Sequence, residues 1–253
     1  MDFIKAKDTY RENAVIQSKM AKKLIQELKL KCGFDRFDNS GGYSNSGGSC
    51  DFKTPAVKNV FEIGSGTGLL TDEIVKNINF DKLFLNDLTE NFTGCIPFKY
   101  YKGDILSIKI EENFNLITSN AVFQWIDDKE KLFNKLFNLL NRDGILAFTT
   151  FGKENFNQIK DTIGFSLNYT DLTPIIEKAG FKILYFEEEL ETLYFKDVRN
   201  ILEHIKLTGV GTNANCLWTK NKYEIFKQKY LEKFSDNNGV ELTYHPLYFI
   251  CRK

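Results

Sequence analysis

The sequence predicts an α/β fold in which a mostly parallel sheet of about seven strands carries helices on both faces. Short runs of β-branched and aromatic residues alternate with helical patterns along most of the 253 residues, as expected for successive β-α-β units. At residues 57–75 a strand, a glycine-rich turn and a helix follow one another directly. We therefore expect a single domain over residues 1–253, with ligands at the carboxyl ends of its strands.

The N-terminal region, residues 1–31, is predicted to be a helical cap. Apolar side chains recur at helical spacing from Ala14 onward, with lysines interleaved, after a short entry segment. Residues 38–53 are rich in Gly, Ser and Asn, which offer little apolar surface to bury. We expect this stretch to be a flexible surface loop that joins the cap to the rest of the chain.

A cofactor-binding core is predicted over residues 55–190. Its first strand is V-K-N-V-F-E-I at 57–63, and a helix follows the glycines from Leu69. Further strands are expected at 82–87, 97–105, 114–120, 145–151 and 181–190. The other expected elements are a one-sided helix near 132–140, a turn at 141–144 and a short helix at 171–179.

The C-terminal part is predicted to be a lid and a last strand. Residues 191–235 have helical patterns, interrupted by glycines at 208–213, and we expect them to form a helical lid over the substrate. Residues 239–253 follow as one long strand, which commonly inserts antiparallel into this kind of sheet. Pro246 has no amide hydrogen to donate, so it suggests an edge position or a bulge.

Composition narrows the class of protein. The chain has 34 basic and 34 acidic residues, so it lacks the basic surplus of a general nucleic-acid binder. Its five scattered cysteines, without a C-x-x-C pair, indicate reduced thiols in a cytoplasmic protein. No apolar run is long enough to span a membrane, and the N-terminus has no signal-peptide core. We expect a monomer with no metal site.

The glycine turn reads E-I-G-S-G-T-G, with Glu62 ahead of Gly64, Gly66 and Gly68. Such a turn leaves backbone N–H groups at a helix N-terminus facing a ligand, where a Cβ would block close approach. A dinucleotide-binding turn has its third glycine where this chain has Leu69, which argues against a nicotinamide dehydrogenase. A purely structural turn is the alternative.

Polar side chains end three later strands. Asp87 follows the glycines by about 20 residues, the spacing at which a carboxylate accepts from ribose hydroxyls. Alternatively, Asp87 caps a helix that begins at Thr89. Asp104 ends the third strand, where this kind of fold places an acid beside an adenine amine, and Asn120 ends the fourth strand.

The glycine turn resembles motif I of class I S-adenosylmethionine-dependent methyltransferases. Further blocks are similar to the malonyl-[acyl-carrier protein] O-methyltransferase family of the biotin pathway, and the likeness covers nearly the whole chain outside residues 38–51. The blocks are A-K-D-T-Y-R-E-N-A…Q, S-N-A-V-F-Q-W-I-D-D, G-I-L-A-F-T-T-F-G, H-I-K-L-T-G-V-G and L-T-Y-H. One departure is Glu62, where many relatives have Asp; the carboxylate is kept.

The resemblance implies a Rossmann-like sheet with an antiparallel last strand, an N-terminal helix and a helical lid. It also implies methyl transfer from S-adenosylmethionine to the free carboxylate of a malonyl thioester, on acyl carrier protein or coenzyme A. Tyr10 is the expected catalytic hydrogen-bond donor. The expected substrate residues are Lys206, His245, Gln124 and Trp125. The expected cofactor residues are Gln17, Glu62, Gly64, Gly66, Gly68, Asp87, Leu88, Asp104, Ile105 and Asn120.

Five of the expected site residues also have a structural interpretation. Tyr10 is alternatively a packing residue, Lys206 a solvated helix residue, and His245 a cap for strand-edge carbonyls. Gln17 and Trp125 are alternatively a surface residue and a core residue. The chemistry needs no general base, because a malonyl carboxylate is already ionised at pH 7. In-line positioning and exclusion of water are then the expected contributions of the protein.

An acidic carrier protein needs a local basic face on this neutral chain. Three clusters are candidates: Lys19, Lys22 and Lys23; Lys196 and Arg199; Lys220 and Lys222. Two other functions remain open at this stage. The chain is alternatively a class I methyltransferase for a different small acid or small molecule, or a non-catalytic protein that only binds the cofactor.

Overall fold

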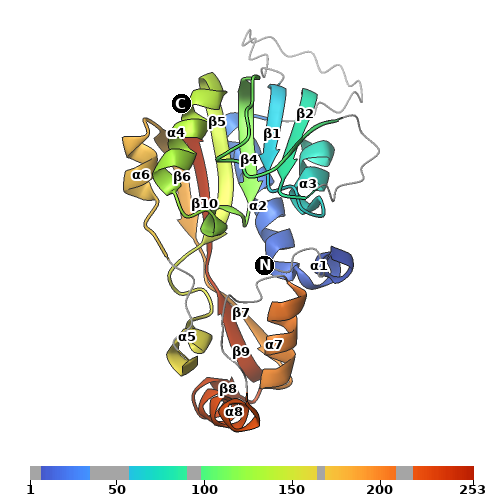
Figure 1. The fold of residues 1–253 in the computed structure, drawn as a ribbon, viewed down its shortest axis with the longest axis vertical. Helices are drawn as coiled ribbons and strands as arrows, with labels where there is room; N and C mark the ends of the chain where they lie inside the picture. Colours follow the sequence, from blue (N-terminus) through green and yellow to red (C-terminus); the bar gives the residue numbers. More distant parts are fainter. Residues whose placement is uncertain (1–6, 35–56, 90–97, 164–168, 209–218) are drawn as a thin grey trace, which may run out of the picture.

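The computed structural model describes residues 7–34, 57–89, 98–163, 169–208 and 219–253. Figure 1 shows a large sheet in the upper half of the molecule and a small sheet below it. The strands of the large sheet are β1 (Val57–Ile63), β2 (Phe80–Asp87), β3 (Phe98–Lys102), β4 (Phe114–Asn120), β5 (Leu140–Phe151), β6 (Lys182–Glu188) and β10 (Pro246–Arg252). The strands of the small sheet are β7 (Glu191–Phe195), β8 (Ser235–Asp236) and β9 (Gly239–Tyr244).

The large sheet has seven strands in the order β3-β2-β1-β4-β5-β10-β6. All neighbours from β3 to β5 pair in parallel, whereas β10 runs antiparallel between β5 and β6. The predicted fold class, including the antiparallel C-terminal strand, is therefore confirmed. Because the chain order reverses on either side of β1, a crevice for ligands is expected at the carboxyl ends of β1 and β4.

Helices cover both faces of the large sheet. They are α2 (Val15–Cys32) and α3 (Leu69–Asn77) on one face, and α4 (Lys129–Leu139) and α6 (Thr173–Lys178) on the other. On the α2 face, Leu24 and Ile74 are fully buried together with Val60 of β1. On the α4 face, Phe133 and Leu136 pack against a phenylalanine-rich strand surface. Burying a side chain of this size contributes about 1.5–3 kcal/mol, so these two faces hold the sheet together.

The small sheet, in the order β7-β9-β8, packs with helices α5, α7 and α8, and α1 contacts α7. These helices are α1 (Lys7–Asn13), α5 (Asn157–Ile163), α7 (Val198–Leu207) and α8 (Lys220–Phe234), and a 3₁₀ turn, η1 (Phe123–Trp125), follows β4. The predicted helical lid is thus α7 and α8, but it also contains a sheet that the sequence did not predict. The glycine break at 208–213 and the loop at 38–53 fall largely or wholly outside the described residues.

The predicted single C-terminal strand is wrong in one respect. The chain leaves the small sheet after Tyr244 and enters the large sheet at Pro246, so one run of sequence forms β9 and β10. Pro246 is the first residue of β10, where its missing amide hydrogen costs no ladder bond in the strand interior. His245, between the two strands, is therefore the point at which the two sheets meet.

Two smaller differences concern the predicted turn and the sixth strand. Residues 141–144 lie within β5, as an irregularity between Leu140 and Ile145, which pair with Phe114 and Leu116 of β4. Asp143 adopts φ 59° there. The strand predicted at 181–190 ends at Glu188, and β7 begins three residues later.

The thiols and helices of the described residues add two observations. Cys32 and Cys251 are both free, and burial raises the pKa of the Cys251 thiol to about 12. The other three cysteines lie outside the described residues. None of the helices that the structure describes combines the length and the apolar character needed to cross a bilayer.

Candidate active site

The carboxyl ends of β2, β1 and β4 lie side by side, because these strands are neighbours in the sheet. β1 ends at Ile63 and leads into the glycine turn, β2 ends at Asp87, and β4 ends at Asn120. The sequence predicted this convergence from the β-α-β order. It brings a flexible backbone turn, a carboxylate and an amide to one edge of the sheet.

The glycine turn adopts a backbone that other residues rarely adopt. Gly64, Gly66 and Gly68 have φ of 69°, 49° and 88°. A Cβ on Gly64 would lie 2.3 Å from Cγ2 of Val122, whereas one on Gly66 would meet only the carbonyl of Gly64, at an ordinary contact distance of 3.9 Å. The amides of Gly64 and Ser65 donate to the carbonyl of Asn86, at 2.7 and 3.0 Å. The glycines are thus required by both the turn and the close approach of the β4 end.

Asp87 connects the end of β2 to this turn. Its Oδ2 accepts from the amide of Gly66 at 2.9 Å, and its Oδ1 accepts from the amide of Thr89 at 3.1 Å. The second contact is the local cap that the sequence left open as an alternative. A carboxylate has about four acceptor positions, so Asp87 retains the capacity to accept from a ligand.

Glu62 is buried beneath the turn, with only 1% of its surface exposed. Its Oε2 accepts from Oγ1 of Thr71 in α3 at 2.6 Å, which joins β1 to the helix after the turn. Burial raises the pKa of Glu62 to about 8, despite the hydrogen bond, and the nearby Asp72 and Asp87 raise it further. Glu62 is therefore protonated over most of the neutral range, and it supports the turn from within the fold.

Arg11 attaches α1 to the outside of the glycine turn, a contact that the sequence did not predict. Its Nε and Nη2 donate to the carbonyl of Thr67 at 2.8 and 2.5 Å, and Nη2 also lies 2.9 Å from Oδ2 of Asp72. The fork of guanidinium donors suits such a two-point contact better than a lysine does. Arg11 directly follows Tyr10 in the sequence, and this position was the feature that could have indicated the contact.

The N-terminal helices also contact the end of β4. Nδ2 of Asn120 donates to the carbonyl of Gln17 at 3.0 Å, and Oδ1 of Asn120 accepts from Thr149 at 2.7 Å. The side-chain Oε1 of Gln17 is buried and has no partner among the described residues. The hydroxyls of Ser65 and Thr67 are in the same situation. Buried polar atoms are rarely left unpaired, so these three atoms are available to a ligand that binds at the turn.

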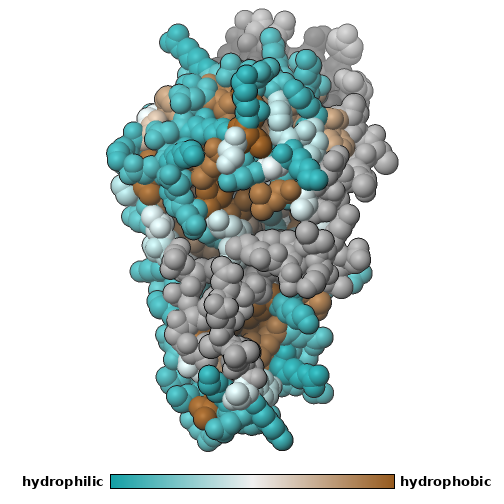
Figure 2. Space-filling model, in the orientation of Figure 1, coloured by the Kyte–Doolittle hydropathy of each residue, from teal (hydrophilic) through white to brown (hydrophobic). Residues whose placement is uncertain are grey.

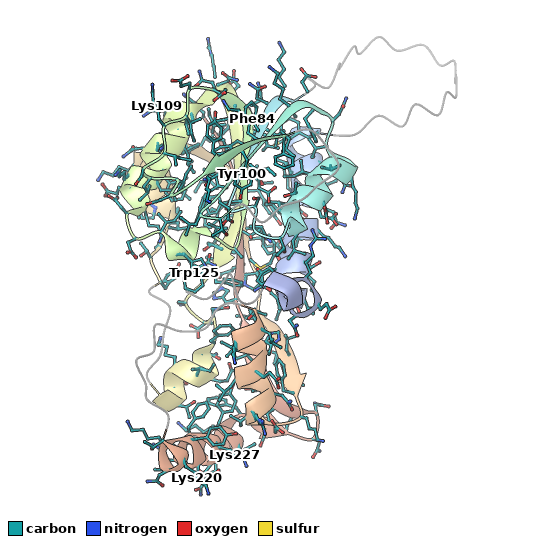
Figure 3. All side chains as sticks on the ribbon, turned by 45° about the vertical axis from the view of Figure 1, so that its right-hand side comes forward. Phe84, Tyr100, Lys109, Trp125, Lys220 and Lys227 are labelled. Atoms are coloured by element: carbon teal, nitrogen blue, oxygen red, sulfur yellow. The ribbon has the colours of Figure 1, made fainter. Side chains whose placement is uncertain are left out.

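Strain marks the start of the segment after β4. Ala121 has φ 55°, and its amide donates to Oγ1 of Thr149 at 3.0 Å. Gln124 is held by the carbonyl of Ala121 and by the hydroxyl of Thr150. Trp125 is half-buried, packs against the interior of the small sheet, and in Figure 3 lies at the lower edge of the large sheet.

The three expected cofactor residues that follow β2 and β3 differ in their exposure. Leu88 is 66% exposed beside Asp87, so it is available to cover a flat ring. Asp104 is exposed, and its Oδ1 accepts from the amide of Leu106 at 2.9 Å, which caps the turn after β3. Ile105 is buried in the large core instead.

Tyr10 lies half-buried on α1, which packs against α7 of the lid. Burial raises its pKa to about 12, so the phenol keeps its proton. The lid offers a second phenol, Tyr244 of β9, whose hydroxyl lies 2.7 Å from Nε2 of His204 in α7. Burial lowers the pKa of His204, so the imidazole is neutral at pH 7. The sequence missed His204, although it is one of only two histidines.

His245 occupies the junction of the two sheets. Its Nδ1 accepts from the amide of Glu154 at 3.1 Å, its Nε2 lies 3.3 Å from Glu188, and its carbonyl accepts from the amide of Gly152 at 2.7 Å. The ring fills the space that a Cβ on Gly152 would need. These contacts hold His245 within the fold, although neither ring nitrogen caps a strand-edge carbonyl as the structural alternative had it. Lys206 is exposed near the C-terminal end of α7.

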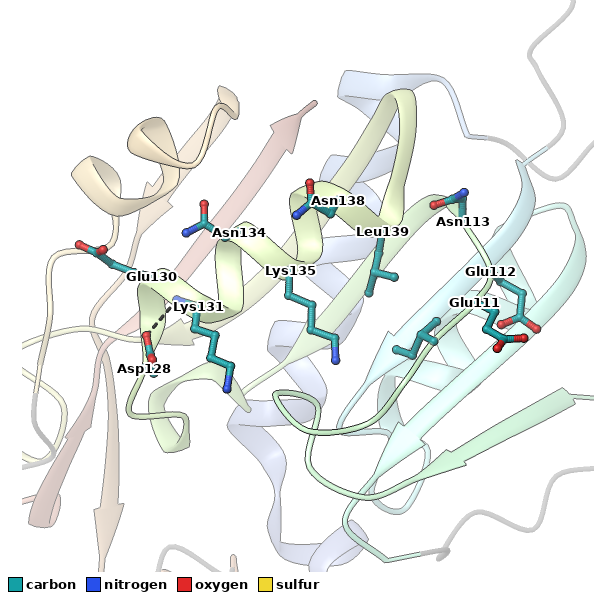
Figure 4. Close-up of a pocket in the computed structure, with 11 residues that line it drawn as sticks. Glu111, Glu112, Asn113, Asp128, Glu130, Lys131, Asn134, Lys135, Asn138 and Leu139 are labelled. Carbon is teal, nitrogen blue, oxygen red and sulfur yellow. Dashed lines mark hydrogen bonds between the residues drawn. The ribbon is translucent and has the colours of Figure 1, made fainter.

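An open groove on the outer side of α4 is separate from this edge. It has a volume of about 780 Å³ and lies between α4 and residues 110–113 (Figure 4). Its charged lining consists of Glu111, Glu112, Asp128, Glu130, Lys131 and Lys135. None of the expected site residues lines it, so we assign the reaction to the glycine-turn edge instead.

The strand order, the glycine turn and the strand-end carboxylate define a class I S-adenosylmethionine-dependent methyltransferase. Comparison with known proteins agrees. Residues 47–209 match a family described as a methyltransferase domain. The fold is shared with the YcgJ protein of Bacillus subtilis, at 12% identity and a TM-score of 0.55 over 78% of this chain and 92% of that chain.

Two curated relatives narrow the family. A malonyl-[acyl-carrier protein] O-methyltransferase of Calditerrivibrio nitroreducens is 38% identical over 100% of this chain and 95% of the relative. One from Acinetobacter baylyi is 31% identical over 99% of this chain and 94% of the relative. The chain belongs to the malonyl-[acyl-carrier protein] O-methyltransferase family.

Proposed function

We propose that this chain transfers the methyl group of S-adenosylmethionine to the free carboxylate of a malonyl thioester carried by acyl carrier protein. The observation that carries the proposal is the meeting of two sets of residues at one edge of the sheet. The glycine turn, Asp87 and Asn120 come from the strand ends. From the N-terminal helices, Gln17 contacts Asn120, and Arg11, the neighbour of Tyr10 in the sequence, contacts the turn at Thr67. The methyl ester would hide the charge, so that fatty-acid enzymes can elongate the product for biotin synthesis.

The residues at the turn fit the cofactor. The backbone of Gly64–Gly68 allows close approach, and Asp87 has acceptor capacity for ribose hydroxyls. The unpaired Oε1 of Gln17 is suited to accept from the ammonium group of the methionine end. Leu88 would cover the adenine, with Asp104 and Ile105 at its edge. When bound, the sulfonium cofactor supplies an already activated methyl group.

The acceptor carboxylate needs orientation instead of a base. Its pKa lies near 4, so it is ionised at the pH of the cell. A strong ion pair on the attacking oxygen would weaken the nucleophile, whereas a neutral phenol can hold the other oxygen by a hydrogen bond. Tyr10 is suited to this role, because its raised pKa keeps the phenol protonated. Gln124 and Trp125 would shape the floor of the cavity, and Lys206 would hold the thioester arm at its rim.

His245 has a different role in this proposal from the one expected. Its Nδ1 accepts from the backbone amide of Glu154, and its Nε2 lies beside the carboxylate of Glu188. Because both ring nitrogens are engaged within the fold, His245 would set the angle between the two sheets and act on the substrate only through that geometry.

The test is a methyl-transfer assay with isotopically labelled S-adenosylmethionine. Malonyl-carrier protein, malonyl coenzyme A and free dicarboxylates are compared as acceptors, and the product is identified by mass spectrometry. We expect a methyl ester on the malonyl thioester and slow or no reaction of free dicarboxylates. Labelling of another acid in preference to both thioesters would contradict the proposal.

A further inference from the structure

The exposed side of α8 carries a row of lysines beside an exposed isoleucine. Lys222, Lys229 and Lys233 follow one another at i, i+7 and i+11, so they lie on one face of the helix, and Ile225 lies next to them. We call these four residues the α8 lysine face. Ile225 is 48% exposed. α8 lies at the lower end of the molecule, and Figure 2 shows this end as mostly hydrophilic with a small hydrophobic area.

Among the described residues, the lysines of this face form no ion pair. α8 contains five lysines and two glutamates. One of the glutamates, Glu232, accepts a hydrogen bond from Gln228 at 3.1 Å and pairs with none of the three lysines. Lys220 and Lys222 also lie in the first turn, where the helix dipole disfavours positive charge. The charges of Lys220 and Lys222 therefore do not stabilise the helix, whereas Lys233 in the last turn suits the dipole. A partner outside the chain is the better account of the charges at the start of the helix. Lys220 and Lys227 are labelled at this end of the molecule in Figure 3.

The other basic clusters are less suited to a partner. Lys19 pairs with Glu191 at 3.0 Å, and Lys23 pairs with Glu187 and Glu189 at 2.9 and 2.6 Å. These lysines connect α2 to the segment that runs from the end of β6 to the start of β7, so they already serve the fold.

The remaining two basic regions are mixed in charge. Arg199 on α7 has Glu203 one turn further along the same face. The groove beside α4 contains four carboxylates for its two lysines, which would repel an acidic partner.

We infer that the α8 lysine face is the docking surface for the carrier protein, an acidic helical protein; the inference rests on the proposed function. Interfaces commonly have an apolar centre with a polar rim, and Ile225 with its three lysines has that arrangement. α7 contacts both α8 and α1. Its 10 residues span about 15 Å, so a carrier on α8 lies one short helix away from Tyr10 and the cleft. The long phosphopantetheine arm bridges that distance.

The test is a charge reversal on this face, Lys222→Glu combined with Lys229→Glu. The matched control is Lys58→Glu with Lys82→Glu, which reverses two exposed lysines at the amino ends of β1 and β2. Binding of the carrier protein is measured by titration, alongside the KM for malonyl-carrier protein and for malonyl coenzyme A. We expect the α8 variant to weaken carrier binding on the order of tenfold or more, and to raise the KM for the carrier substrate equally.

The same variant should leave kcat and the KM for malonyl coenzyme A unchanged, because the cleft is intact. Ile225→Ala should also weaken carrier binding, and added salt should reduce the difference between wild type and the α8 variant. Equal carrier binding by wild type and the α8 variant would overturn the inference, as would equal weakening by the control. If the wild type binds the carrier through α8 but methylates neither thioester, the docking surface stands and the proposed function fails.

Discussion

Buried tyrosines distinguish the cores of the two sheets. The core around the small sheet combines tyrosines with phenylalanines, whereas the buried aromatic residues between the large sheet and α4 are all phenylalanines. The large sheet uses phenylalanine: the rings of Phe61 and Phe114 stack at 4.6 Å between centroids, and those of Phe148 and Phe249 stack at 4.9 Å. The fully buried aromatics around the small sheet include Tyr230, and its hydroxyl donates to the carbonyl of Glu241 at 2.9 Å.

Polar contacts continue through the small sheet. Gln158 of α5 donates to Oγ1 of Thr243 at 2.7 Å and accepts from its amide at 3.0 Å. Tyr244 bonds to His204. A phenylalanine core is held by burial, which has no direction, whereas these contacts require defined geometry. The difference suggests a division of work in which the large sheet supports the cofactor turn and the small sheet orients side chains toward the acceptor.

The largest expected effect is on the cofactor turn. Gly64→Ala should abolish cofactor binding and lower the free energy of unfolding by roughly 2–4 kcal/mol, because it combines a left-handed φ with a clash against Val122. Calorimetric titration with S-adenosylmethionine and urea unfolding measure the two effects. The double variant Gly64→Ala, Val122→Ala removes the nearest atoms and should recover part of the stability. Wild-type affinity in Gly64→Ala would remove this turn from the cofactor site.

Glu62 should make the stability of the large sheet dependent on pH. The pKa of this carboxyl is about 8 in the folded state and ordinary in the unfolded state, so the folded chain binds the extra proton. Stability is therefore lost as pH rises from about 4.5 to 8, on the order of a few kcal/mol, and changes little above that range. Glu62→Gln keeps an acceptor for Thr71 and should flatten this dependence in urea unfolding at pH 5–8. An identical slope in both proteins would show that Glu62 ionises normally.

Asp87→Ala should weaken cofactor binding by about 1.5–3 kcal/mol, the range for hydrogen bonds to a charged group. Asp104→Ala is the comparison, since Asp104 is exposed and caps its own turn, and we expect a smaller loss. Both are measured by calorimetry. Equal losses of cofactor affinity in the two variants would contradict the proposal that Asp87, beside the glycine turn, contributes more to cofactor binding than Asp104 does.

Tyr10→Phe should lower turnover by roughly tenfold, or about 1.5 kcal/mol, with cofactor affinity nearly unchanged. Tyr10 is proposed to hold the acceptor carboxylate, so its loss should lower turnover and leave cofactor affinity intact. Substitutions at the glycine turn should instead lower cofactor affinity. Since the raised pKa of the phenol is about 12, wild-type turnover should show no titration of Tyr10 below pH 10. A wild-type rate in Tyr10→Phe would make this residue a packing residue only.

Local chemistry explains which features could be predicted from the sequence. The turn needs glycines because its φ values are positive, and Asp87 follows because parallel strands end at the same edge. These are short-range requirements that restrict the residue type directly. Family resemblance supplied Tyr10 and Gln17, and the proposal still uses both.

Long-range contacts explain what could not be predicted. Arg11 donates to a carbonyl 56 residues away in the sequence, and His204 contacts Tyr244, which is 40 residues away. No sequence spacing predicts either pair. The division of the last strand depends on His245 fitting against Gly152 in another segment. Pro246 was the local sign of that division, but proline alone does not distinguish a bulge from a strand that begins there.

Hydrogen–deuterium exchange with and without S-adenosylhomocysteine most directly tests the claim that the large sheet binds the cofactor and the small sheet does not. We predict slower exchange at residues 64–68 and 87–89 and at the α1–α2 region around Arg11 and Gln17, with little change in β9 and α8. Protection concentrated in β9 and α8, with the glycine turn unaffected, would contradict the assignment of the cofactor to the edge of the large sheet.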